Sequence, residues 1–167
     1  MLKNIPYYLL LGVFTGFVSL YFTRGTMFVE SVIGKLKNSY AKWIIGSLAL
    51  GAVIFFIPPL YGEGYDTLNA LFNGTPEALT YGSLFYGVAD KLWLMAAFLV
   101  LIILFKVVAT ALTTGSGGVG GIFAPTLFMG GVSGYLVAKV INIFSFVNVS
   151  ERNFALVGMA GMMAGVM

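Results

Sequence analysis

A glycine-dense stretch from Gly115 to Gly121 lies inside a run of 32 residues, Val107 to Ala138, that carries no charged side chain. Five of the seven residues from Gly115 to Gly121 are glycine. Each glycine costs about 1 kcal/mol relative to alanine inside a helix, and adjacent glycines open backbone conformations that other residues avoid. Irregular backbone survives at membrane depth only where protein buries it or where it lines a polar cavity. We therefore expect a helix break at about residues 114 to 122.

The residues after the glycines predict the start of a new helix. Ile122, Phe123, Ala124 and Pro125 lead into an apolar segment with small residues at helical spacing, and proline is favoured in a first helical turn because its missing N–H is not needed there. A helix N-terminus presents free N–H groups and the positive end of its dipole, which together bind anions. The candidate anion ligands are the backbone amides of Ile122, Phe123 and Ala124. The motif residues around the break are Gly115, Ser116, Gly117, Gly118, Gly120, Gly121 and Pro125.

The composition is that of an integral membrane protein. Of 167 residues, 59% are hydrophobic and 9% are charged, whereas soluble domains carry about 25% charged residues. The fold class we expect is an all-α, multi-pass bundle of membrane helices. The net charge of +3 is too small and too dispersed to indicate a nucleic-acid partner.

Two residue types needed by common membrane enzymes are absent. The sequence has no cysteine and no histidine, which excludes disulfides, thiolate nucleophiles, most zinc sites and a Ser-His couple. Ser116 has no neighbouring base to activate it, so we interpret it as a turn residue that bonds its own backbone. We expect neither enzymatic activity nor a metal or cofactor.

Hydropathy and turn signals divide the chain into helices. Between Lys3 and Arg24 lie 20 uncharged residues, enough for one crossing, and the apolar spacing predicts that this helix continues towards Lys37. A second apolar run, Trp43 to Gly62, contains Pro58-Pro59, which should stop its helix. We expect a short helix over Thr67 to Phe72 capped by Asp66 or Thr67, a third span from Lys91 to Thr113 with Lys106 snorkelling near its end, a fourth helix from about Phe123 to Phe144, and a fifth from about Glu151.

The basic residues indicate topology. Lys35, Lys37 and Lys42 lie in the first connection, which the positive-inside rule places in the cytoplasm. The amino terminus then begins outside, from which we expect a preceding segment. At the other end, Met167 follows an apolar helical pattern without a stop signal, so we expect the chain to be cut within a helix.

Small residues four apart predict close helix packing in lipid. They occur at Gly12/Gly16, Gly130/Gly134/Ala138 and Gly161/Gly165. Asp90 and Lys91, at the edge of a span, are interpreted as an interfacial pair.

Two soluble-protein motifs match the glycines only in form. Gly115-x-Gly117-x-x-Gly120 fits the dinucleotide fingerprint, but that motif follows a strand and has an acidic residue about 20 positions on, whereas here an apolar helix precedes it and the next acid is Glu151. A phosphate-binding P-loop lacks its lysine. The alternative interpretation of the glycines is a flexible hinge between two helices. A hinge does not require the Gly-x-Phe-x-Pro pattern that is present here.

The same residues resemble one family. Gly115-Ser116-Gly117-Gly118 running into Gly121-Ile122-Phe123-Ala124-Pro125 is similar to the GSGG…GxFxP signature of CLC chloride channels and H⁺/Cl⁻ exchangers. Gly62 to Thr67 resembles the family's glycine-rich turn before a short helix, and Phe154 to Ala160 resembles the start of its next inner helix. The resemblance covers essentially the whole chain.

The resemblance implies a voltage-gated chloride channel or antiporter in which two inverted repeats form each subunit of a homodimer. Residues 1–167 resemble most of the second repeat, as a single transmembrane fragment lacking its last helices. The backbone amides of Ile122, Phe123 and Ala124 would then help to hold chloride. The implied partners are chloride, lipid and the remaining segments of the parent, and the expected location is the bacterial plasma membrane.

Other parts of the family's site belong to segments outside this chain: the serine of GSGxP, the gating glutamate of GxEGP, the internal proton-transfer glutamate and a tyrosine ligand. Gly118 follows Ser116 in place of the family's x-Pro pattern, so the ligand role of the family's serine is not transferred to Ser116. Glu63 is likewise not the gating glutamate. Alone, the chain should not conduct. Channel and exchanger both stay open, as do a membrane scaffold or assembly segment with a glycine hinge and a transporter of another small anion.

Overall fold

The computed structural model describes residues 4–75, 92–144 and 148–167. Every regular element in these ranges is helical, which confirms the all-α fold class. The elements are α1 (Ile5–Gly34), α2 (Ser39–Phe56), the short 3₁₀ helix η2 (Pro58–Leu60), α3 (Tyr65–Asn73), α4 (Leu92–Gly115), α5 (Phe123–Phe144) and α6 (Glu151–Val166).

Four of these helices are long and apolar enough to cross a membrane. They are Ile5–Gly34, Ser39–Phe56, Trp93–Gly115 and Phe123–Phe144. At about 1.5 Å per residue, the 30 residues of α1 exceed the thickness of a bilayer core, in agreement with the predicted continuation past Arg24.

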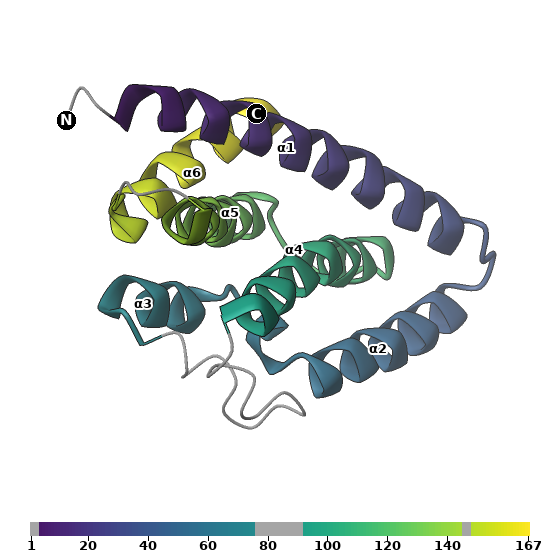
Figure 1. Cartoon of the computed structure of the whole chain (residues 1–167). Coiled ribbons are helices and arrows are strands. Elements are labelled where there is room, and N and C mark those ends of the chain that lie inside the picture. The colour runs from purple at the N-terminus through teal and green to yellow at the C-terminus, as the bar shows by residue number, and fades with distance from the viewer. Residues whose placement is uncertain (1–3, 76–91, 145–147) are drawn as a thin grey trace.

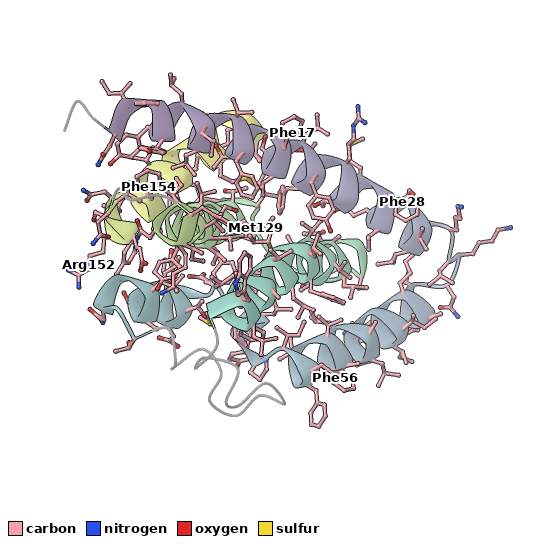
Figure 2. The ribbon with its side chains drawn as sticks, in the orientation of Figure 1. Phe17, Phe28, Phe56, Met129, Arg152 and Phe154 are labelled. Atoms are coloured by element: carbon pink, nitrogen blue, oxygen red, sulfur yellow. The ribbon has the colours of Figure 1, made fainter. Side chains whose placement is uncertain are left out.

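The α1–α2 hairpin encloses α4 (Figure 1). The two helices join near Asn38, whose side chain accepts a hydrogen bond from the backbone N–H of Tyr40 at 3.0 Å. Helix α2 packs mainly on α4 and leaves its other side uncovered by the described residues; Phe56, for example, points away from the bundle (Figure 2). As expected, α2 ends just before Pro58-Pro59.

The core lies where α4 and α5 meet the other helices. Helix α5 packs on α1, α3, α4 and α6, and Met129 and Phe154 lie fully buried in this interior (Figure 2). Its observed bounds, Phe123–Phe144, are those that the sequence predicts, as is the start of α6 at Glu151.

The small residues of α5 and α6 bring the two backbones together. A Cβ atom added to Gly130 would lie 2.6 Å from the Gly158 carbonyl oxygen, and one added to Gly134 would meet the backbone of Phe154. Ala138 is fully buried. The predicted packing face of α5 is therefore confirmed.

The other two predicted faces differ in outcome. Gly161 and Gly165 pack against Thr15 and Ser19 of α1, as close helix packing requires. A Cβ atom added to Gly12 or Gly16 would have no atom of another described element within 4 Å, so that packing prediction is wrong within the described chain.

Helix α3 starts earlier than the sequence predicts, and its cap is different. It spans Tyr65–Asn73, and its N-cap is Gly64, with φ of +85°, rather than Asp66 or Thr67. The Phe128 ring occupies the space that a Cβ on Gly64 would need. The N-cap position therefore needs a residue without a side chain close to α5, a requirement that local capping preferences do not reveal.

Candidate functional site

The predicted helix break is present and has a defined structure. Helix α4 ends at Gly115 and α5 begins at Phe123. Gly117 has φ of +93°. Its N–H donates to the Thr114 carbonyl at 3.2 Å, and the N–H of Gly118 donates to the Thr113 carbonyl at 2.9 Å. This pair of bonds is a Schellman motif, which satisfies two of the last carbonyls of a helix and favours glycine in the left-handed position.

The amides of the predicted anion site lie at the first turn of α5. Among the described residues no hydrogen bond has the N–H of Ile122, Phe123 or Ala124 as its donor. The first regular bond runs from the N–H of Thr126 to the Ile122 carbonyl at 3.1 Å, and Pro125 has no N–H. The start of α5 thus presents donors without acceptors, as a helix N-terminus does.

A cavity of about 620 Å³ adjoins this helix start. Phe123 and Ala124 line the cavity, whereas Ile122 is absent from its wall. The structure therefore brings two of the three predicted amide residues together at one space. The remaining wall consists of Leu50, Ile54, Leu60, Tyr61, Gly62, Glu63, Tyr65, Lys106, Ala109, Thr110, Thr113, Thr114, Val119, Gly120, Gly121 and Pro125.

Three threonines of α4 form a polar stripe along the cavity. Thr110 donates its hydroxyl hydrogen to the Lys106 carbonyl at 2.8 Å, and Thr113 donates to the Ala109 carbonyl at 2.9 Å. Thr114 donates to a carboxylate oxygen of Glu30 on α1 at 2.6 Å. These hydroxyls have given their hydrogens to other acceptors, so in this arrangement they are not available as donors to a group in the cavity.

Lys106 does not snorkel, contrary to the sequence-based expectation. It is 3% exposed, and its Nζ donates to the carbonyls of Leu60 at 3.2 Å and Gly62 at 2.9 Å. Nζ also lies 4.6 Å from the centre of the Phe128 ring. Its position nine residues before the end of α4, about 13 Å along the axis, was the sequence signal for this burial.

Ser116 also differs from its predicted role. Its hydroxyl is buried without a hydrogen-bond partner among the described residues, rather than bonded to its own backbone. The hydroxyl lies where a Cβ on Gly46 of α2 would be, while the Ser116 N–H donates to the Leu112 carbonyl at 3.1 Å. Gly46 therefore allows α2 to approach the end of α4. The predicted Asp90–Lys91 pair lies outside the described residues.

The family and the relatives of this chain agree with its motifs. The family model for the voltage gated chloride channel matches residues 1–167. Chloride channel protein CLC-e of Arabidopsis thaliana is 30% identical over 178 residues, covering 98% of this chain and 23% of the relative. The H(+)/Cl(-) exchange transporter ClcA of Vibrio cholerae is 29% identical over 171 residues, covering 98% of this chain and 32% of the relative.

The chain thus spans between about a quarter and a third of the length of these two relatives. No solved structure matches it. With four apolar helices of membrane-spanning length and a family match over every residue, the chain is an integral membrane protein that belongs to the voltage-gated chloride channel family.

Proposed function

We propose that this chain forms one wall of the chloride pathway in a chloride channel or proton-coupled chloride exchanger. The observation that carries the proposal is the set of amides at the start of α5 that have no acceptor among the described residues, together with the presence of Phe123 and Ala124 in the cavity wall. Ile122 contributes its N–H from the same turn. Family membership supports chloride as the ion.

The chemistry of these groups suits a transported anion. Neutral N–H dipoles and the positive helix end attract chloride after it loses water. They do so without a direct ion pair, and conduction requires an ion to leave as well as to enter. The threonine hydroxyls beside them already donate elsewhere, so the amides are the better donors.

The full site includes segments beyond these residues. We propose that the rest of the parent protein supplies the other anion ligands, the gate and any proton path, and that the parent is a homodimer, with a bacterial plasma membrane as its location. No catalytic residue and no cofactor take part in this function. One relative is named a channel and another an exchanger, so both modes belong to the proposal.

The test uses the complete protein with Phe123→Pro, which removes one N–H at a position where proline fits the helix start. Phe123→Leu is the matched control, because it changes the side chain and keeps the amide. Loss of one hydrogen bond to an anion should weaken chloride binding by about tenfold or more, measured by calorimetry on purified protein. Equal affinities of the two variants would remove the amide from the site.

Two further readouts separate the rival functions. If the wild-type protein binds no halide, a scaffold with a glycine hinge is favoured. If nitrate or fluoride outcompetes chloride in flux measurements on reconstituted vesicles, the pathway serves another small anion.

A further inference from the structure

Lys106 is a buried cation within a membrane-spanning helix. Its side chain is 3% exposed, and its partners in the described part of the chain are two backbone carbonyls and one aromatic ring. Among the described residues, no carboxylate oxygen lies within 4.0 Å of Nζ; the ion pair that the structure contains joins Lys139 to Glu151 at 3.7 Å. The ammonium is therefore hydrogen-bonded, and no countercharge from the described part of the chain lies beside it.

These partners offset only part of the desolvation free energy of the buried Lys106 ammonium. Carbonyl dipoles and a ring face stabilise an ammonium, yet they carry no net charge. Charged residues inside membrane spans are costly, and those that occur are usually paired or face an ion pathway. Lys106 faces such a space, because it lines the 620 Å³ cavity together with the first turn of α5.

Residues from two helices that carry positive potential thus line one cavity. Phe123 and Ala124 belong to the N-terminal end of α5, and Lys106 carries the ammonium of α4. The geometry ties them together, since Nζ lies over Phe128, five residues into α5. The cavity wall also includes Glu63, which is exposed and is not within ion-pair distance of Lys106. Glu30 lies behind Thr114 and accepts its hydroxyl hydrogen.

We propose that Lys106 is the fixed positive charge that selects anions in this cavity, with the passing anion supplying its countercharge. The inference rests on the proposed function and adds a specificity-determining residue to it. The bonds to Leu60 and Gly62 hold the ammonium against the wall, so it acts on the anion through space rather than as a direct ligand. A restrained charge of this kind attracts chloride without trapping it.

The experiment compares charge with hydrogen bonding in the complete protein. Lys106→Gln keeps a donor and removes the charge, Lys106→Met keeps the unbranched stem and removes both, and Lys106→Arg keeps both. For unit charges about 10 Å apart at an effective dielectric constant of about 20, loss of the charge should weaken chloride binding at least about tenfold. Chloride affinity is measured by calorimetry, and the chloride-to-sodium permeability ratio is measured in vesicles.

We expect Gln and Met to lose chloride affinity and anion selectivity together, and Arg to retain both. Lys139→Met, which removes a lysine charge outside the cavity wall, should leave both unchanged. Thermal unfolding in chloride-free gluconate buffer establishes that each variant is folded. A purely positioning role would move the unfolding temperature of Gln and Met without a charge-dependent change in selectivity.

Three outcomes would overturn the inference. Folded Gln and Met variants that bind chloride as tightly as the wild type would show that the charge is irrelevant, although the proposed function would stand. Neutral variants that stay unfolded at every chloride concentration, beside a folded Arg variant, would assign the charge to folding. A wild-type protein that binds no halide would remove the proposed function and this inference with it.

Discussion

The break between α4 and α5 and the contact between α5 and α6 are both rich in glycine, but glycine serves a different purpose in each. At the break, Gly117 has open space around it and a positive φ, so glycine is favoured there because it adopts this backbone conformation without strain. At the contact, Gly130 and Gly134 lie inside a regular helix and face backbone atoms of α6, so glycine is needed there because a side chain would collide with α6. Adjacent glycines end a helix, whereas glycines four apart let two helices touch.

The largest expected effect comes from filling the α5–α6 contact. Gly134→Ala places a Cβ atom against the Phe154 carbonyl oxygen and 2.8 Å from Cα of Ala155, and backbone cannot move aside as a side chain can. We expect a loss of about 3 kcal/mol or more in unfolding free energy, at the upper end of overpacking costs. Thermal unfolding of the purified protein measures it.

Gly12→Ala is the matched control for that prediction, because a Cβ there has no neighbour within 4 Å in the described chain. It should be neutral, or stabilising by up to about 1 kcal/mol through helix propensity. Similar losses for both variants would contradict the view that close approach is what the α5 glycines provide.

A smaller effect is expected from Gly117→Ala at the break. The substitution meets no steric neighbour, so its cost is the strain of a left-handed backbone, about 1 to 2 kcal/mol. Gly120→Ala, at a position without positive φ and with Thr113 Cγ2 3.8 Å away, should cost less. If the two variants unfold at the same temperature, conformation is not what Gly117 contributes.

The smallest effect is expected from the ion pair that joins α5 to α6. Lys139 and Glu151 are 3.7 Å apart, with side chains 20% and 28% exposed. Such partly solvated pairs contribute about 0.2 to 1 kcal/mol, so Lys139→Met should lower stability slightly, and less at high salt. An effect as large as that of Gly134→Ala would mean that charge, rather than close packing, holds these helices together.

Local patterns were sufficient for the long helices and for the break. Uncharged runs, Pro58-Pro59 and the glycines of 115–121 predicted the helix ends, because hydropathy, proline and glycine act on the nearest few residues. The candidate amides could be placed at the start of α5 for the same reason. That Phe123 and Ala124 line the cavity while Ile122 does not depends on where α2, α3 and α4 lie.

Three of the failed predictions, those for Lys106, the α3 cap and Ser116, share one cause, which is contact between segments far apart in the chain. Lys106 was expected to reach the membrane surface, yet carbonyls 44 and 46 residues earlier in the chain hold it inside. The cap of α3 depends on Phe128, and the Ser116 hydroxyl lies against Gly46. No window of neighbouring residues contains these partners.

The sequence by itself determined that this chain is a membrane helix bundle of the chloride channel family with a helix break before Phe123, because composition and local backbone chemistry carry that information. Only the tertiary structure decided that a buried lysine, the residues Gly62, Glu63 and Tyr65 at the start of α3, and the first turn of α5 meet at one cavity. The physical reason is that burial and electrostatic potential are set by packing between helices, which bring together groups that the sequence keeps tens of residues apart.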